Sequence, residues 1–176
     1  MISLARILLV PVVVWLLLAG STGARWAAGI VFVVGAVTDG VDGYLARRWD
    51  VKTKTGQWLD PLADKALVAA PIITLAIQGE FPWWAAVLIL AREVAVALLR
   101  VLLGTRGRSM PATFPAKVKT VTQITAITMY VLPLGTWADG LKFAVLVAAV
   151  VLTLFTGVQY AAFALAPESP REQAAG

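Results

Sequence analysis

Six long apolar stretches, separated by short polar turns, account for nearly all of this 176-residue chain. Hydrophobic residues make up 60% of the chain and charged residues only 14%, whereas charged residues form about a quarter of an ordinary soluble domain. A helix needs about 20 mostly apolar residues to cross a lipid bilayer. The length therefore allows six such helices and no additional soluble domain. We predict an all-α integral membrane protein with six transmembrane helices.

Glycine, proline and other turn-forming residues mark the ends of the six apolar stretches. Residues 1–166 are expected to form one membrane domain, followed by a polar C-terminal tail over residues 167–176. The first helix lies very close to Met1, so we expect a short amphipathic segment to precede it in a longer natural chain. The predicted helices cover residues 5–20, 26–48, 60–78, 82–104, 116–135 and 140–166.

The basic residues predict which ends of the helices face the cytoplasm, because positive charge is enriched in cytoplasmic loops. Most lysines and arginines follow the second or the fourth predicted helix, and the opposite side has little beyond Arg25 and Lys142. We therefore expect both termini and both basic loops to be cytoplasmic. The basic residues on that side are Arg47, Arg48, Lys52, Lys54, Arg106, Arg108, Lys117, Lys119 and Arg171.

The sequence contains no cysteine and no histidine. Their absence excludes disulfides, thiol nucleophiles, Cys/His zinc sites and histidine-dependent catalysis. Carboxylates, lysines, arginines, hydroxyl groups and a bound metal remain available for chemistry. The net charge of +5 is carried by loops without interleaved aromatic residues. It therefore indicates anionic lipid or phosphate ligands and no nucleic acid.

Four aspartates lie in these apolar surroundings: Asp39 and Asp42 are three residues apart, and Asp60 and Asp64 are four apart. On helices, each pair shares one face. Ionisable residues inside membrane helices are energetically costly and usually mark functional sites. Carboxylate oxygens are the ligands that hard cations such as Mg²⁺, Mn²⁺ and Ca²⁺ prefer. We therefore predict that the two pairs face each other around bound divalent metal, with structural carboxylates paired with Arg47, Arg48 and Lys65 as the alternative.

The aspartates belong to a longer pattern that resembles the signature of the CDP-alcohol phosphatidyltransferase family, D-x-x-D-G-x-x-A-R-x8-G-x3-D-x3-D. The resemblance implies that all four aspartates bind Mg²⁺ or Mn²⁺ and that Asp64 is the general base of catalysis. It also implies CDP-diacylglycerol as a substrate, and a homodimer, which is common in the family. Every fixed position of the signature is present: Asp39, Asp42, Gly43, Ala46, Arg47, Gly56, Asp60 and Asp64.

The same resemblance assigns a second set of residues to CDP-diacylglycerol. Arg47 can bind a diphosphate through two parallel hydrogen bonds. The alternative is that its side chain only extends to the membrane–water interface to place its charge in water. The small residues would leave space for the nucleotide, and they also permit close helix packing. The full set is Gly43, Ala46, Arg47, Thr53 and Gly56.

The second half of the chain resembles the bacterial phosphatidylglycerophosphate synthases, which share the motifs A-R-E, L-R and G-K-x-K-T-x-x-Q. Ala116 replaces the glycine of the last motif. Arg92 and Glu93 fall in the middle of a predicted helix, and because neighbouring residues do not face each other on a helix, each is expected to have a partner elsewhere. Their alternative role is an ion-pair network that holds the helices together. Arg100, Lys117 and Lys119 are expected to bind the phosphate of glycerol 3-phosphate, with ordinary cytoplasmic positive charge as the alternative.

The resemblance implies a specific reaction at the cytoplasmic face of a bacterial cell membrane. A phosphatidyl group would pass from CDP-diacylglycerol to sn-glycerol 3-phosphate, giving phosphatidylglycerophosphate and CMP. Direct displacement is expected, with an aspartyl intermediate as the alternative. Phosphatidylglycerol, as in a cardiolipin synthase, and inositol phosphate are the alternative acceptors. A divalent-cation transporter is the alternative of another class, and it would tolerate loss of Arg47.

Overall fold

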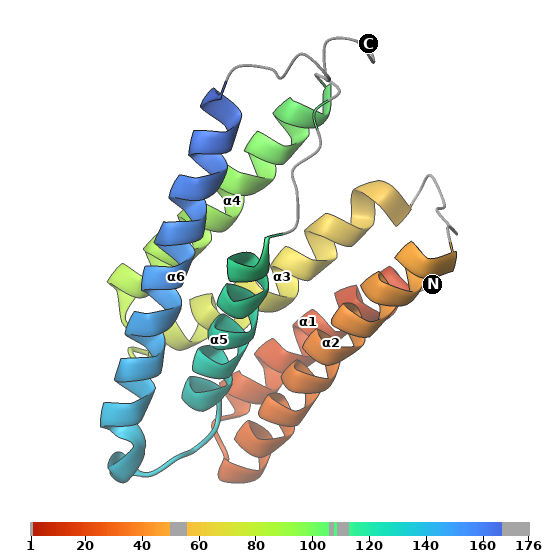
Figure 1. Cartoon of the computed structure of the whole chain (residues 1–176). Helices are drawn as coiled ribbons and strands as arrows, with labels where there is room; N and C mark the ends of the chain where they lie inside the picture. The colour runs from red at the N-terminus through yellow and green to blue at the C-terminus, as the bar shows by residue number, and fades with distance from the viewer. Residues whose placement is uncertain (1, 50–55, 106–107, 109–112, 167–176) are drawn as a thin grey trace.

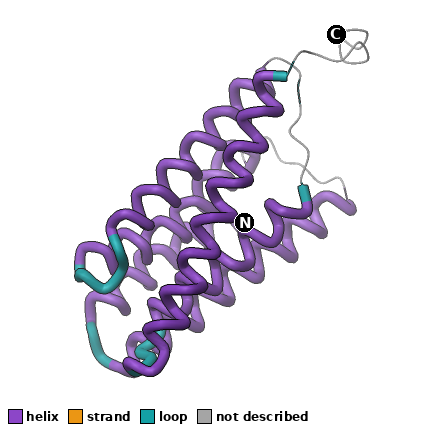
Figure 2. The backbone as a smooth tube through the Cα atoms, turned by 60° about the vertical axis from the view of Figure 1, so that its left-hand side comes forward, coloured by secondary structure: helices purple, strands orange, loops and turns teal. Residues whose placement is uncertain are grey.

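In the computed structural model, the chain forms six long α-helices and one short 3₁₀ helix (Figure 1). The structure describes the backbone of residues 2–49, 56–105, 108 and 113–166, and no strand occurs within these ranges (Figure 2). Side chains are described for residues 7–38, 65–105, 108 and 113–166. The helices are α1 (Ile2–Ala19), α2 (Thr22–Trp49), α3 (Gly56–Ile77), α4 (Trp83–Thr105), α5 (Phe114–Val131), η1 (Thr136–Ala138) and α6 (Asp139–Leu165).

The all-helical fold and the number of long helices confirm the prediction from the sequence, and the helix boundaries differ from it by a few residues. Helix α2 begins four residues earlier than predicted, because Ser21 caps it. The Oγ of Ser21 accepts a hydrogen bond of 3.2 Å from the backbone N–H of Ala24, which would otherwise lack a partner in the first turn. Helix α3 also begins early, at Gly56, so Pro61 lies beyond its first turn.

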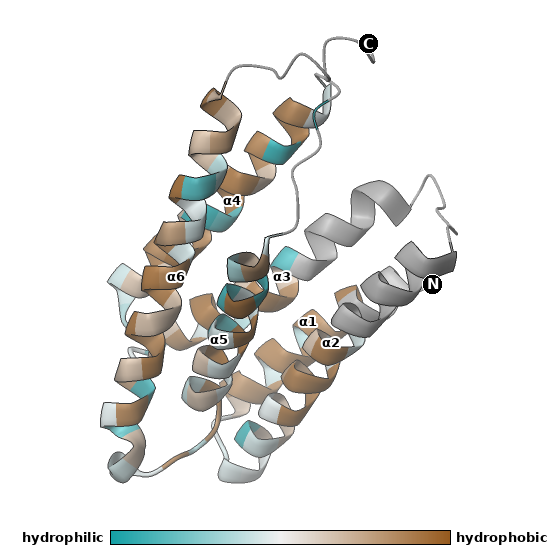
Figure 3. Cartoon of the chain, viewed as in Figure 1, coloured by the Kyte–Doolittle hydropathy of each residue, from teal (hydrophilic) through white to brown (hydrophobic). Residues whose placement is uncertain are grey.

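One segment, Thr136–Leu165, is long and apolar enough to cross a membrane, among the residues that the structure describes. Shorter apolar stretches occur at Ile7–Ala19, Thr22–Thr38 and Lys65–Ile77. Figure 3 shows brown, apolar residues over most of the described helices and hydrophilic residues in α3, α4 and α5. The six helices are thus present in the structure, whereas a membrane crossing by each of them stays a prediction.

The helices pack as two groups, α1 to α3 and α4 to α6, which meet where α5 contacts α2 and α3 and where α4 contacts α3 (Figure 1). Helix α1 contacts α2 and α3, and α4 contacts α6, while α5 contacts α2, α3 and α6. The interior contains fully buried large residues from every long helix. These include Phe32 of α2, Ile72 of α3, Ile89 of α4, Ile127 of α5 and Leu146 of α6. This packing brings α3, α4, α5 and α6 together around the polar side chains described next.

Candidate active site

The structure places the signature residues on two helices that contact each other, α2 and α3. Each aspartate pair falls within one helix. The side chains of residues 39–64 lie outside the described residues, as does Thr53 altogether. Asp39, Asp42, Gly43, Ala46 and Arg47 belong to α2, and Gly56, Asp60 and Asp64 belong to α3.

The donor set of the signature fits a hard divalent cation. Its four aspartates offer carboxylate oxygens, the ligands that Mg²⁺ and Mn²⁺ prefer, and the sequence contains no histidine or cysteine to favour a softer metal. Among the side chains that the structure describes, no three acidic residues come together as a second metal site. By this chemistry the four aspartates are the candidate metal ligands of the signature.

A polar cluster begins one residue after Asp64, at Lys65, and joins four helices. The Nζ of Lys65 donates a hydrogen bond of 3.0 Å to the backbone carbonyl of Glu93 in α4 and lies 3.9 Å from Oε2 of its carboxylate. The other carboxylate oxygen, Oε1, accepts from Nζ of Lys119 in α5 and lies 3.3 Å from Nη1 of Arg92. We call Lys65, Arg92, Glu93 and Lys119 the inner cluster.

Arg92 extends the inner cluster to α6. Its Nε donates to the backbone carbonyl of Thr153 at 3.1 Å, and its Nη2 donates to Oγ1 of Thr156 at 2.8 Å. The guanidinium also lies 5.7 Å from the centre of the Tyr160 ring, within range of a cation–π contact. Gly157 permits this approach, because a Cβ there would lie 3.3 Å from Cγ of Arg92.

These contacts confirm that Arg92 and Glu93 each have a partner on another helix. The two side chains also contact each other, although they are adjacent in the sequence. Spacing along a helix did not predict this contact, because an arginine side chain is long enough to bend back to its neighbour.

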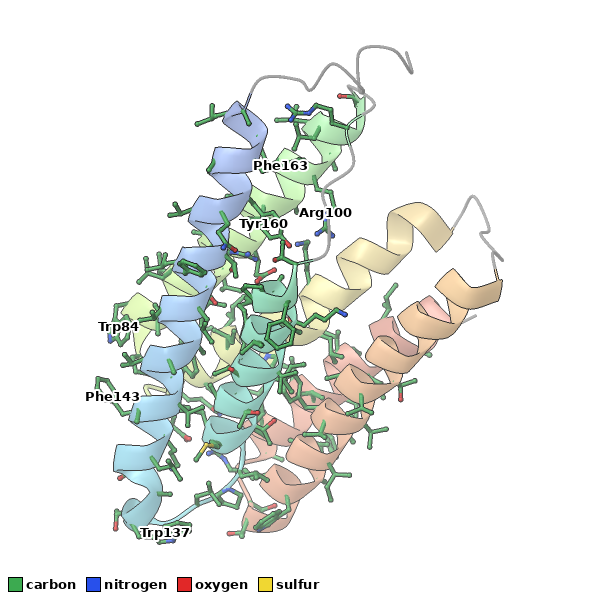
Figure 4. All side chains as sticks on the ribbon, viewed as in Figure 1. Trp84, Arg100, Trp137, Phe143, Tyr160 and Phe163 are labelled. Atoms are coloured by element: carbon green, nitrogen blue, oxygen red, sulfur yellow. The ribbon has the colours of Figure 1, made fainter. Side chains whose placement is uncertain are left out.

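The predicted acceptor residues differ in their surroundings. Lys119 is only 5% exposed and is paired with Glu93, whereas Lys117 and Arg100 are exposed. Arg100 is close enough to Lys65 to repel it electrostatically, and Figure 4 shows its side chain beside the inner face of α4. Of the described acidic side chains (Glu80, Glu93 and Asp139), Glu93 alone belongs to this region.

Positive charge is therefore in excess around Glu93. Three cationic side chains, those of Lys65, Arg92 and Lys119, lie against this one carboxylate among the described residues, and Arg100 adds a fourth positive charge near Lys65. Cations held together in a site of low polarity repel each other unless anions offset their charge. The arrangement can thus bind an anionic group next to the segment that carries Asp64.

The comparison with protein families decides the chain's relationship. The model of the CDP-alcohol phosphatidyltransferase family matches residues 1–155, which include the whole signature and the inner cluster. The chain belongs to this family. The resemblance drawn from the sequence is thereby confirmed, and the chain is a phosphatidyltransferase of a family of membrane enzymes.

Two relatives illustrate how far the similarity extends. The chain is 40% identical over 167 residues to a "Probable phosphatidylglycerophosphate synthase" of Mycobacterium tuberculosis (strain ATCC 25618 / H37Rv), covering 93% of this chain and 79% of the relative. It is 35% identical over 165 residues to the "CDP-diacylglycerol--glycerol-3-phosphate 3-phosphatidyltransferase" of Escherichia coli (strain K12), covering 91% of this chain and 90% of the relative. The similarity thus spans more than 90% of this chain, 79% of the first relative and 90% of the second.

Sequence reasoning did not assign a functional role to Lys65 in this phosphatidyltransferase. The available signal was a cation directly after Asp64, at the start of the apolar part of α3. Arg108 was expected to be topological charge only, yet it is 9% exposed. Its Nη1 and Nη2 donate to the backbone carbonyls of Ala166 at 3.2 Å and Phe163 at 3.4 Å, so it caps the end of α6.

The opposite end of the phosphatidyltransferase carries a second set of charges. Arg25 and Glu80 form two contacts of 2.5 and 2.6 Å, and Lys142 lies 3.2 Å from Oδ1 of Asp139. Figure 4 shows Trp137 at this end, away from Arg100 and Phe163. We call Arg25–Glu80 and Asp139–Lys142 the outer pairs. They line a pocket of about 330 Å³ in which each cation has its own acid.

Proposed function

We propose that this chain transfers a phosphatidyl group from CDP-diacylglycerol to sn-glycerol 3-phosphate, giving phosphatidylglycerophosphate and CMP. The observation that carries the proposal is the similarity of nearly the whole chain to relatives named for this reaction, at 35–40% identity. The motifs around Arg92, Arg100 and Lys119 support the same acceptor.

In the proposed reaction, the C1 hydroxyl oxygen of glycerol 3-phosphate attacks the phosphorus that carries diacylglycerol. A new P–O bond forms as the P–O bond to CMP breaks, and CMP leaves. Asp64 accepts the hydroxyl proton, because a carboxylate can act as a general base when it lies within hydrogen-bonding reach of the attacking group. This displacement needs no covalent intermediate with the protein.

The signature residues would bind the donor substrate. Asp39, Asp42, Asp60 and Asp64 would hold Mg²⁺ or Mn²⁺, which when bound offsets the negative charge of the diphosphate. Arg47 would bind the diphosphate, since a guanidinium matches two phosphate oxygens at once. The remaining residues of the CDP-diacylglycerol site would be Gly43, Ala46, Thr53 and Gly56.

The excess of positive charge near Asp64 supports an acceptor-phosphate site. Arg100 and Lys117 are exposed and can reach a soluble anion, whereas Lys119 is buried against Glu93. We infer that all three bind the phosphate of glycerol 3-phosphate. Phosphatidylglycerol would instead require room for a second lipid beside these charges.

A membrane crossing by all six helices is part of the proposal, with both termini and the signature on the cytoplasmic side and the protein as a homodimer. The internal hydrogen bonding of α5 supports a crossing by that polar helix. Its threonine hydroxyls donate to backbone carbonyls four residues earlier, so they need no water. These residues are Thr120, Thr122, Thr125 and Thr128, at 2.8 to 2.9 Å.

The proposed function is tested by release of CMP from CDP-diacylglycerol by the purified protein with Mg²⁺ or Mn²⁺, with one acceptor at a time. We expect release with glycerol 3-phosphate, and a loss of about 10²- to 10⁴-fold in Asp64→Asn, the range that a general base contributes. The matched control is Asp139→Asn, which removes the same charge at the opposite end and should retain activity.

Each other outcome of this experiment has a definite meaning. Release with phosphatidylglycerol or inositol phosphate alone would keep the mechanism and replace the acceptor. Folded protein that binds metal but releases no CMP with any acceptor would contradict the transferase and favour a cation transporter. Full activity in Asp64→Asn would remove the assigned base.

A further inference from the structure

We propose that Glu93 is a positioning residue that holds Lys65 in place as an additional ligand for the acceptor phosphate. The inference rests on the proposed function, because it concerns the binding of the second substrate at the same site. Lys65 would act together with Arg100, Lys117 and Lys119, and Glu93 would act through Lys65.

The contacts of Glu93 identify it as the anchor of the cluster. Its backbone carbonyl accepts from Lys65, and its carboxylate lies against cations of two helices, Arg92 of α4 and Lys119 of α5. Arg92 is in turn fixed to α6 by two hydrogen bonds of 2.8 and 3.1 Å. Glu93 therefore cannot move without breaking contacts to several helices, and Lys65 takes its position from a rigid partner.

Lys65 retains the capacity to bind a phosphate. Its ammonium has three N–H donors, and the described contacts use one of them in a hydrogen bond, to the carbonyl of Glu93. Its side chain is 33% exposed, compared with 7% for Lys119, so it is more accessible to a soluble ligand. It also directly follows Asp64 in α3, which keeps it near the reacting groups.

The charge balance separates this cluster from one that only holds helices together. A purely structural pair would match each cation with an acid, as the outer pairs do. Here Glu93 is shared among three cations, with Arg100 close to Lys65. A phosphate dianion from the acceptor would reduce the repulsion among them.

The test compares Lys65→Met, Glu93→Gln and the double variant, using KM for glycerol 3-phosphate and for CDP-diacylglycerol. We expect Lys65→Met to raise KM for glycerol 3-phosphate roughly tenfold, the effect of losing one charged hydrogen bond. Glu93→Gln keeps the backbone carbonyl that Lys65 contacts but removes the carboxylate charge that lies 3.9 Å from Lys65 and pairs with Lys119. It should raise the same KM, and neither variant should change KM for CDP-diacylglycerol. In the double variant, KM should stay below the product of the two separate effects, because part of the effect of Glu93→Gln passes through Lys65 and the rest through Lys119.

If charge alone determined binding, Glu93→Gln would lower KM for glycerol 3-phosphate, so the direction of the change in KM separates the two explanations. Removal of a negative charge without a positioning effect would attract the phosphate more strongly and lower KM. A lower KM, independent effects in the double variant, or equal changes for both substrates would overturn the proposal. Glu93→Asp keeps the charge on a shorter side chain, and we expect an intermediate KM.

The folded state is checked by the melting temperature of each variant in detergent. If Glu93→Gln does not fold, Lys65→Met still decides, because an unchanged KM for glycerol 3-phosphate in that variant contradicts the proposal. Wild-type protein that releases no CMP with glycerol 3-phosphate would contradict the proposed function itself. Active wild-type protein with unaffected variants would contradict the positioning role alone.

Discussion

The inner cluster and the outer pairs use the same kinds of side chain in opposite ways. In the outer pairs, each cation meets its own acid at a helix end, and both acids are well exposed, Glu80 at 44% and Asp139 at 63%. In the inner cluster, one carboxylate that is 22% exposed serves cations from three helices. The outer pairs have equal positive and negative charge and exposed acids, whereas in the inner cluster positive charge exceeds negative charge among the described side chains and the shared carboxylate is mostly buried.

This difference indicates that the outer pairs only stabilise the fold, whereas the inner cluster has positive charge available to bind an anionic ligand. Exposed, balanced ion pairs contribute about 0–1 kcal/mol each and need no further partner. A mostly buried cluster with excess positive charge is costly unless an anion joins it. A phosphatidyltransferase handles anionic substrates, so the unbalanced cluster is where substrate binding is expected. The pocket among the outer pairs has the space for a ligand but no excess charge.

The largest effect that separates the two regions is expected from removing Lys119. We expect Lys119→Met to lower kcat/KM for glycerol 3-phosphate roughly 100-fold, since breaking a buried ion pair costs about 3–5 kcal/mol and part of that cost falls on substrate binding. The measurement is CMP release at varied acceptor concentration. The matched control is Lys142→Met in the outer pairs, where activity should stay within about twofold. Equal losses in both variants would show that the comparison does not separate function from stability.

A second effect is expected from Arg92, which links the inner cluster to α6. We expect Arg92→Met to lower the melting temperature by roughly 10 °C, because the loss of a mostly buried charged partner costs about 3–5 kcal/mol and each kcal/mol shifts the midpoint of a chain of this size by about 2–4 °C. The measurement is thermal unfolding in detergent. An unchanged midpoint would mean that the contacts of Arg92 with Thr153 and Thr156 do not stabilise the bundle.

The sequence was sufficient to predict most of the fold, for a simple physical reason. The length of each apolar stretch indicates a helix regardless of what it packs against. The early start of α2 depends on a single hydroxyl, that of Ser21, and η1 is a local turn, so neither alters the apolar pattern. Crossing of the membrane by each helix is harder to predict, because α4 carries Arg92, Glu93 and Arg100 in its apolar sequence.

The candidate site was predictable only where a motif specifies it. The signature indicated the four aspartates and the two helices that carry them. Spacing also showed that Arg92 and Glu93 need partners, but not which ones. The choice of Lys65 and Lys119 depends on how α3 and α5 align along α4, and a helical repeat gives the face of a helix but not its alignment with a neighbour.

The smallest effect is expected at the outer pairs, from Arg25→Met. Two guanidinium nitrogens of Arg25, Nη1 and Nη2, contact the carboxylate of Glu80, which is 44% exposed. The Arg25 side chain is only 12% exposed, but its acid is well exposed and can be solvated by water when the pair is lost. A pair of this kind contributes about 0–1 kcal/mol, so the melting temperature should fall by only about 2 °C, and activity should remain within about twofold of wild type. The measurement is the melting temperature of Arg25→Met and of Arg92→Met under the same conditions. The two values can be compared directly, since both variants replace an arginine with methionine. A loss of stability as large as that of Arg92→Met would show that exposure and charge balance do not explain the difference between the two regions. A large loss of acceptor-dependent CMP release would instead mean that the outer pairs communicate with the site at the other end of the bundle.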